Sequence, residues 1–137
     1  MTNIAETVAD IRRLETELNK QIDRTNPNMI FLAQRRLALG FLSAIIRTSP
    51  VDTGRFRGNW HVSINRIRNL PVKRIDKDGS STLALGIGKM AKIPDYSIVY
   101  VSNNVDYALD LNRGKSKQAP PGFVELALRE ALLPFDR

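Results

Sequence analysis

The sequence contains no cysteine and only one histidine among its 137 residues. Without cysteine there can be no disulfide framework and no thiolate chemistry, and a single histidine argues against a zinc or iron site. No stretch is apolar over the length that crossing a bilayer requires, and the polar, acid-containing first residues do not resemble a signal peptide. We therefore expect a soluble, unsecreted protein that folds in the cytoplasm and carries no metal or other cofactor.

The motifs of nucleotide-binding and catalytic sites are also missing. Gly86 and Gly88 lack the third glycine and the following helix of a dinucleotide fingerprint. Residues 114–116 read Gly-Lys-Ser, like the end of a phosphate-binding loop, but Leu109 stands where that loop needs its upstream glycine. The lone His61 has no evident partner acid, and no pair of carboxylates lies in an apolar setting that would shift a pKa. We expect no catalytic residue, and therefore not an enzyme.

Acidic residues are few in the middle of this chain, whose formal net charge is +7. Between residues 47 and 74 the only acid is Asp52, and the cations are Arg47, Arg55, Arg57, Arg66, Arg68, Lys73 and Arg74. This excess favours an acidic partner, either nucleic acid or an acidic protein surface. Zinc-finger spacing and an aromatic-rich RNA-binding signature are both missing. If the chain contacts DNA, the candidate DNA-facing residues are Arg55, Arg57, Arg66 and Arg68.

The length and a hydrophobic content of 42% suit a single domain, residues 1–137, with a core of its own. Apolar residues recur at helical intervals over residues 4–22 and again over residues 30–48. Asn3 and Glu6 resemble a capping box at the start of the first helix. Asn26 and Pro27 break that helix, so the second should begin at Asn28. Its core-facing side is predicted to hold Ile30, Ala33, Leu37, Phe41, Ala44, Ile45 and Thr48.

A structural hinge is predicted where the second helix ends, within residues 49–60. Pro50 cannot continue a helix. Asp52 and Thr53 can hydrogen-bond their own backbone in a turn, and Gly54 can adopt a positive φ without steric cost. The alternation of charged and aromatic residues at 55–57 then predicts that the chain enters a strand directly after this turn.

Three short segments have the alternating pattern of half-buried strands, residues 60–65, 82–87 and 96–102. Their connections contain no evident crossover helix, which predicts antiparallel pairing. Residues 124–132 predict a final helix that Pro134 ends. The expected fold class is therefore α+β, with two N-terminal helices, a small antiparallel sheet and a C-terminal helix. One shared core is expected to contain Phe41, Ile45, Trp60 and Leu128.

A second informative stretch, residues 105–123, runs from Tyr107 into a basic loop that contains glycine. The two prolines near its end stiffen the backbone before the last helix. One interpretation is a surface loop that only docks this helix. The other is a loop that projects backbone and positive charge towards a neighbouring subunit. On that hypothesis, the interface residues are Arg113, Gly114, Lys115, Lys117, Pro120 and Pro121.

The hinge and this loop, taken in order, resemble the HK97 gp10-like family of tailed-bacteriophage neck and tail-completion proteins. The first match is Ser-Pro-Val-Asp-Thr-Gly-Arg-Phe-Arg at residues 49–57, with Trp60. The second is Tyr-Ala at 107–108, followed by the glycine and proline loop at 114–123. The resemblance spans roughly residues 37–132. Two positions depart from the family pattern: Asn112 stands where glutamate is usual, and Lys115 where histidine is frequent.

This resemblance implies a virion structural protein of the head-to-tail junction, located in the neck or tail and assembled in the host cytoplasm. Such a protein would form a homo-oligomeric ring, with a hexamer as a candidate copy number, that joins the head connector to the tail and lets DNA pass. The implied partners are other neck, connector and tail proteins, with transient contact to DNA in the channel and none with a membrane.

The alternative is a basic DNA-binding or packaging accessory protein whose arginines follow the phosphates of DNA. Binding by a monomer that falls steeply with salt concentration would favour this alternative. Rings that form as the protein concentration rises would favour the neck protein.

Overall fold

The computed structural model describes residues 9, 12, 13, 16, 20, 30–94 and 96–135. The single positions described within residues 9–20 are helical, and the rest of the predicted first helix, with its capping box, lies outside the described residues. The elements that follow are α2 (Ile30–Thr48), α3 (Arg55–Gly58), β1 (His61–Ile64), α4 (Ser80–Met90), β2 (Val99–Ser102), α5 (Ala108–Asp110), a π-helical turn (Leu111–Lys115), α6 (Phe123–Leu132) and a 3-10 turn (Leu133–Phe135). None of these helices is long and apolar enough to cross a membrane.

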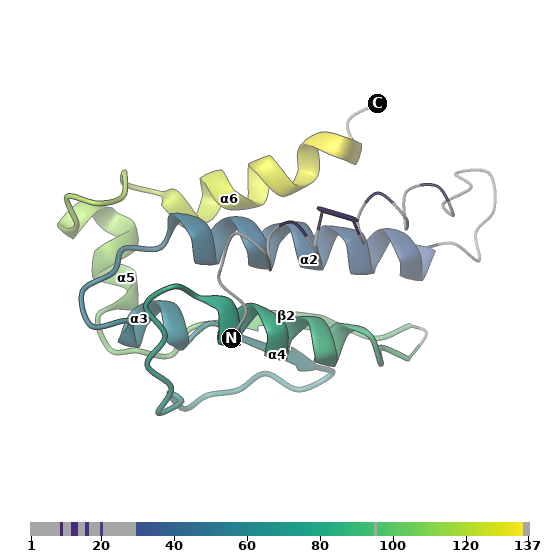
Figure 1. Ribbon diagram of the computed structural model, residues 1–137, viewed down its shortest axis with the longest axis horizontal. Coiled ribbons are helices and arrows are strands. Elements are labelled where there is room, and N and C mark those ends of the chain that lie inside the picture. Colours follow the sequence, from purple (N-terminus) through teal and green to yellow (C-terminus); the bar gives the residue numbers. More distant parts are fainter. Residues whose placement is uncertain are drawn as a thin grey trace.

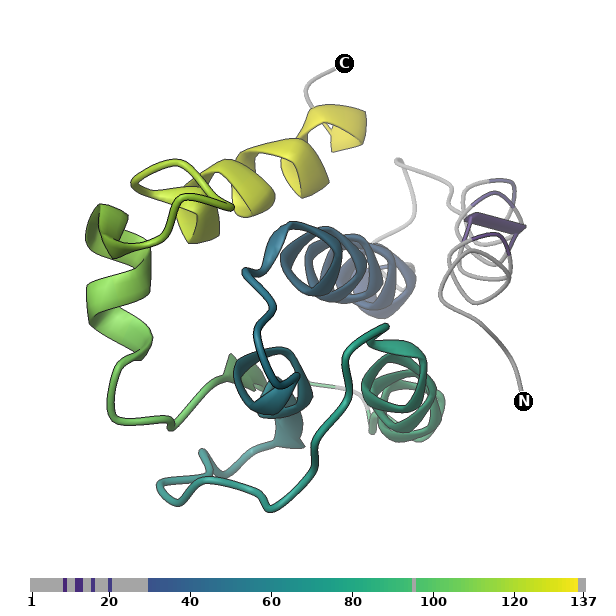
Figure 2. The ribbon, with the colours of Figure 1, turned by 60° about the vertical axis from the view of Figure 1, so that its left-hand side comes forward.

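The long helix α2 lies at the centre of the described fold (Figure 1). It packs against α6 on one side, and against α4 and β2 on the other. The view in Figure 2 shows α2 nearly end-on, with α3, α4 and α6 arranged around it. This arrangement explains why α2 must present apolar side chains in more than one direction.

The predicted core face of α2 is correct in part. Ala44 and Ile45 are buried, but so are Leu39, Leu42 and Ile46, which the one-face pattern omits. Because α2 is covered both by α6 and by α4, its buried surface is wider than the stripe of an ordinary surface helix. The predicted end of α2 at Thr48 is confirmed.

The strand predicted over residues 82–87 is wrong, since this segment belongs to α4. Its buried residues Leu83, Gly86 and Met90 follow a helical spacing. The alternating pattern in the sequence comes instead from Leu83, Leu85 and Ile87, of which Leu85 is 51% exposed. The buried carboxylate of Asp76 stabilises the start of the helix, because it accepts bonds from the backbone of Gly79 (3.1 Å) and from the backbone and hydroxyl of Thr82 (2.8 and 2.7 Å).

The remaining two predicted strands form an antiparallel pair, in which Val62 lies opposite Val101. Both strands are shorter than predicted, covering residues 61–64 and 99–102. The antiparallel prediction is confirmed, but the reason given for it is wrong, because α4 lies in the connection between the strands. The α+β class is confirmed, with a sheet of two strands among the described residues.

Three of the four predicted core residues contact one core, but Leu128 does not belong in it. Ile45 and Trp60 are buried in the core cluster, and Phe41 is partly buried and packs against the same cluster. The indole of Trp60 donates a hydrogen bond of 2.8 Å to the hydroxyl of Ser49, at the end of α2. Leu128 is 43% exposed, because it lies at the edge of the contact between α6 and α2.

Replacing Trp60 with alanine should therefore lower the free energy of unfolding by about 3 to 5 kcal/mol, because a buried ring and its hydrogen bond are both lost. Urea denaturation measures this change. Leu128→Ala is the control, with an expected loss of about 1 kcal/mol or less. Equal losses in the two variants would contradict the assignment of Trp60 to the core.

Candidate partner-binding groove

The hinge has the tight turn that its residues predict. The hydroxyl of Thr53 accepts a hydrogen bond of 3.1 Å from the backbone N–H of Arg55, and Gly54 has a φ of +95°. The strand expected directly after the turn is wrong, because residues 55–58 form the single helical turn α3. The strand β1 begins only at His61, once Gly58 and the following residues have redirected the chain.

Two glycines let α3 lie directly against the backbone of residues 74–77. A Cβ atom on Gly54 would lie 2.6 Å from the backbone nitrogen of Lys77, and one on Gly58 would lie 2.5 Å from the carbonyl oxygen of Arg74. The backbone N–H of Asp76 also donates a bond of 3.0 Å to the carbonyl of Gly54. The hinge glycine is therefore needed both for its φ and for this close backbone contact.

Arg57, a candidate DNA-facing residue, is turned towards the protein. Its guanidinium donates to the carbonyls of Ser49 (2.9 Å), Arg47 (3.4 Å) and Lys77 (2.8 Å). It thereby joins the end of α2 to the segment that follows residue 76. Burial lowers the pKa of Arg57, and the nearby Asp76 and Asp78 oppose that effect.

The other candidate DNA-facing arginines lie in different surroundings. Arg68 donates to the carbonyls of Leu70 (2.8 Å) and Pro71 (3.4 Å). Arg55 is exposed, stacks over the ring of Tyr107 at 5.6 Å and lies 3.9 Å from a carboxylate oxygen of Asp106. Arg66 is also exposed. The structure therefore does not place these arginines in one equivalent row.

Phe56 connects the hinge to the second informative stretch. Its buried ring contacts the rings of Trp60, Tyr107 and Phe123, with centroid distances of 5.7, 6.3 and 6.0 Å. The contacts with Trp60 and Phe123 are edge-to-face, an arrangement that aromatic rings prefer. The aromatic cluster of Phe56 and these three residues fixes α3 against the starts of α5 and α6.

Asn112 closes the loop that precedes α6. Its backbone carbonyl accepts a bond from the N–H of Gly122 (2.6 Å), and its side-chain carbonyl accepts one from the N–H of Val124 (3.0 Å). Its amide nitrogen lies 3.0 Å from the carboxylate of Glu125, and the bond it donates there lowers the pKa of Glu125. A glutamate at position 112 has no N–H to donate to Glu125, which explains why asparagine suits this loop.

The predicted interface residues line this closed loop. Gly114 has a φ of +112°, and a Cβ atom there would lie 2.9 Å from the ring of Pro121. Lys115 lies 3.6 Å from the carboxylate of Asp110. The remaining members of the set are exposed, namely Arg113, Lys117, Pro120 and Pro121. The loop therefore presents cations and proline rings on a surface whose backbone is held in place.

Gln118 joins the loop to the hinge. Its side-chain oxygen accepts a bond of 2.9 Å from the N–H of Val51, and its side-chain nitrogen donates one of 2.8 Å to the carbonyl of Val51. This reciprocal pair resembles one rung of a sheet, although the partners lie 67 positions apart in the sequence. The hinge and the loop therefore form one surface.

Between them lies a groove of about 560 Å³, which we call the hinge–loop groove. Its hinge side consists of residues 50–56, and its loop side of Tyr107, Leu111 and residues 115–118. The side chains of Arg55, Lys115 and Lys117 place positive charge along it, while Asp52 supplies an acid. The groove suits recognition of a mixed polar and apolar segment, since it combines cations with the rings of Phe56 and Tyr107.

The described residues contain no group of three or more histidine, cysteine, aspartate or glutamate side chains placed to hold a metal ion. Comparisons with models of known protein families, with curated proteins and with solved structures found no significant match to this chain. The hinge–loop groove is therefore interpreted from its own geometry.

Sequence reasoning found both sides of the groove but missed the residues that hold them together. Gln118 bonds to a residue 67 positions away, and Asn112 to residues 12 and 13 positions away, so no pattern of adjacent residues indicates their roles. The alternating pattern places Phe56 in a strand, although its spacing to Trp60 also fits one turn of helix.

Replacing Gly54 with alanine should lower the free energy of unfolding by about 2 kcal/mol or more, because a positive φ costs about 1 to 2 kcal/mol and the new methyl group meets the backbone of Lys77. The matched control is Gly88→Ala. Gly88 lies in α4 with open space where the methyl group of alanine would lie, so this change should stabilise the protein by about 0.5 to 1 kcal/mol. Thermal denaturation that shifts in the same direction for both variants would contradict the close backbone contact of Gly54.

Replacing Gln118 with alanine should release the loop from the hinge while the core stays folded. Two hydrogen bonds to Val51 are lost, each with a net contribution of about 0.5 to 1.5 kcal/mol. Hydrogen exchange at the Val51 amide should therefore speed up about tenfold. Lys117→Ala, one residue away, is the control and should leave this exchange unchanged. Unaltered exchange in the Gln118 variant would mean that the pair does not hold the groove together.

Proposed function

We propose that this protein is a virion structural protein of the head-to-tail junction of a tailed bacteriophage. In this role it forms a ring that joins the head connector to the tail and lets DNA pass. The observation that carries the proposal is the hinge–loop groove. The two stretches that resemble neck proteins lie on its two sides, and they are joined by Gln118 and by the ring of Phe56.

The groove supports a role in assembly because it is preformed. Phe56 and Asn112 hold the walls of the groove in place within the fold. The groove therefore loses little conformational entropy when a partner segment binds to it. Lys115 and Lys117 lie on the loop side, where charges influence the rate and orientation of association more than its strength. This combination suits a repeated contact between copies, or between neighbouring proteins in a stack.

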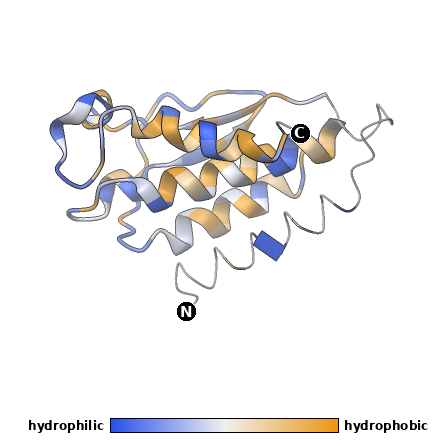
Figure 3. Ribbon diagram, turned by 90° about the horizontal axis from the view of Figure 1, so that it is seen from above, coloured by the Kyte–Doolittle hydropathy of each residue, from blue (hydrophilic) through white to orange (hydrophobic). Residues whose placement is uncertain are grey.

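A second surface supports the same proposal. Leu37, Phe41 and Leu128 line an apolar groove of about 310 Å³, together with residues of β2. The leucines exposed along α6 and the turn after it are Leu126, Leu128, Leu132 and Leu133. Figure 3 shows that hydrophobic and hydrophilic segments alternate along α6, which ends beside the C-terminus mark. Exposed apolar area of this kind is typical of interaction surfaces.

A ring requires two different faces on each subunit, so that each copy contacts the next in the same direction. The hinge–loop groove and the apolar surface of α6 are two such faces. They differ in chemistry, because one is lined by cations and the other by leucines. A heterologous contact between unlike faces is therefore available to this fold.

The alternative function is a basic DNA-binding or packaging accessory protein. The net charge of +7 and the exposed Arg55 and Arg66 favour it. Against it, the guanidinium groups of Arg57 and Arg68 already donate to backbone carbonyls of this chain. A smaller set of arginines then remains for contacts with phosphates.

The proposal is tested by replacing both Lys115 and Lys117 with glutamate. The variant should stay folded, because both side chains are exposed. It should fail to form rings as protein concentration rises, measured by light scattering. In an assembly reaction with heads and tails, electron microscopy should show them unjoined, since reversed charges at the groove repel the partner.

The control replaces Lys73 and Lys92 with glutamate. These exposed lysines lie outside the groove, and the change in net charge is the same. This control should assemble normally. If the Lys115 and Lys117 variant instead joins heads to tails normally but binds duplex DNA less tightly, the loop contacts phosphates, its role in assembly is contradicted and the DNA-binding alternative is supported.

A further inference from the structure

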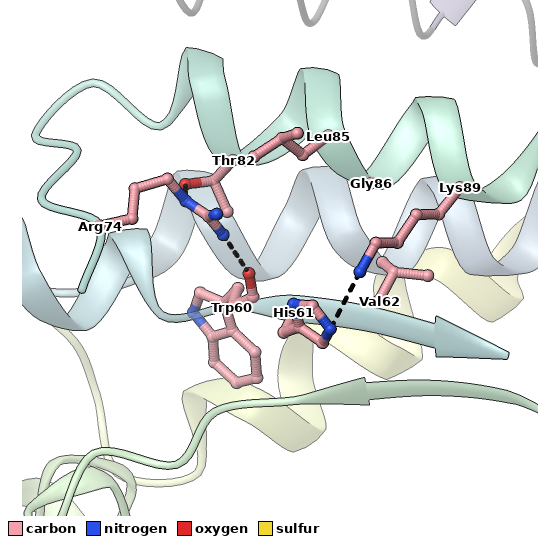
Figure 4. Close-up of a pocket in the computed structure, with 8 residues that line it drawn as sticks. All are labelled: Trp60, His61, Val62, Arg74, Thr82, Leu85, Gly86 and Lys89. Carbon is pink, nitrogen blue, oxygen red and sulfur yellow. Dashed lines mark hydrogen bonds between the residues drawn. The ribbon is translucent and has the colours of Figure 1, made fainter. Parts of the chain in front are cut away.

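A separate pocket lies between β1 and α4, away from the hinge–loop groove (Figure 4). Its volume is about 200 Å³. The residues that line it are Trp60, His61, Val62, Arg74, Thr82, Leu85, Gly86 and Lys89. The histidine and the tryptophan are the only ones in the sequence. We call this cavity the His61 pocket.

The cations of the His61 pocket are held by neutral groups. The guanidinium of Arg74 donates to the hydroxyl of Thr82 (3.2 Å) and to the carbonyl of Trp60 (3.1 Å). The ammonium of Lys89 lies 3.0 Å from Nε2 of His61. A dashed line marks this contact in Figure 4. An ammonium group can only donate, so Nε2 must accept, which places the ring proton of the neutral imidazole on Nδ1.

No carboxylate among the described residues forms an ion pair with Arg74 or Lys89. Burial lowers the pKa of Arg74, and the nearby Asp76 opposes this effect, but the two oxygens of Asp76 accept bonds from Gly79 and Thr82. The positive charge of the pocket is therefore only partly compensated within the described chain.

The positive charge of the pocket also affects the pKa of His61. Burial, and then Lys89, Arg68 and Arg74, lower its pKa from 6.5 to about 4. On the paired strand β2, the residue opposite His61 is the neutral Ser102, and Tyr100 lies two positions away. Burial, followed by the charges of Arg68 and Arg74, also lowers the pKa of Lys89. An anion in the pocket would be attracted by all of these cations.

The walls of the pocket indicate what kind of anion fits. Val62, Leu85 and Gly86 supply apolar surface beside the cations, and Leu85 is 51% exposed at α4. A glutamate side chain has methylene groups that can contact such walls while its carboxylate meets the cations. The phosphates of duplex DNA lie on a broad, polar backbone that has no comparable apolar stem.

We infer that the His61 pocket binds an acidic side chain, with glutamate as the best fit, presented by a partner polypeptide. Lys89 contacts the carboxylate, the charge of Arg74 attracts it, and Leu85 contacts its methylene groups. This inference goes beyond the proposed ring, because the pocket requires only an acidic partner. The His61 pocket can fail to bind glutamate while the hinge–loop groove still functions in assembly. Equally, the pocket can bind glutamate if the assembly role of the groove is wrong.

The test uses N-acetylglutamate amide as the probe, titrated to about 100 mM because a single side chain binds weakly. The unique His61 and Trp60 give unambiguous signals in the proton NMR spectrum. Both should shift in a saturable manner, and the pKa of His61 should rise from about 4 because a bound carboxylate stabilises the imidazolium. N-acetylglutamine amide, which has the same shape without the charge, should cause no saturable shift.

Lys89→Gln supplies a second measurement, with Lys92→Gln as its control on an exposed position nearby. The first variant should weaken probe binding by about tenfold and the second should leave it unchanged. The inference is overturned if the charged probe causes no saturable shift in the unaltered protein, or if the neutral amide causes the same shift. It is also overturned if a short DNA duplex shifts His61 at much lower concentration than the probe, since the pocket then serves phosphates.

Discussion

The contact of Phe56 with three other aromatic rings is the interaction on which the described architecture depends. Phe56 belongs to the hinge, Trp60 precedes β1, Tyr107 precedes α5 and Phe123 begins α6. Elements that are distant along the chain therefore meet at one buried ring. A groove built on such a cluster has walls that the hydrophobic core fixes in place, which is a requirement for a surface that must recognise the same partner repeatedly.

The short helix α3 connects this cluster to the rest of the molecule. One side of α3 carries Phe56, and the glycines at 54 and 58 place its backbone against residues 74–77. Arg74 in that segment contacts Gly58 through its carbonyl and reaches the His61 pocket through its guanidinium. The hinge–loop groove and the His61 pocket are thus built on two segments that share a backbone contact. A substitution that moves α3 should disturb both sites together.

Local signals in the sequence are sufficient to predict the hinge, because Pro50 and Gly54 act on the backbone next to them. They are insufficient for residues 82–87, because Leu83, Leu85 and Ile87 alternate like a strand over this short stretch. The carboxylate that stabilises the start of α4 belongs to Asp76, which lies outside the stretch. The contact that joins the two sides of the groove could not be predicted, because only the complete fold brings Gln118 next to Val51. The exposure of Leu128 likewise could not be predicted without knowing how α6 packs on α2.

The hydrogen bonds of the arginines change how the positive charge of the chain is interpreted. Arg57 and Arg68 donate to backbone carbonyls, which satisfies their hydrogen bonds but does not neutralise their charge. A carbonyl carries only a partial charge, so the field of the guanidinium still extends to the surface, although the group itself is not free to grip a phosphate. Arg68 is one of the charges that, after burial and Lys89, lower the pKa of His61. An acidic partner of the kind proposed would therefore be attracted by arginines that it need not touch, and exposed cations such as Lys89 and Lys117 would set its docking position.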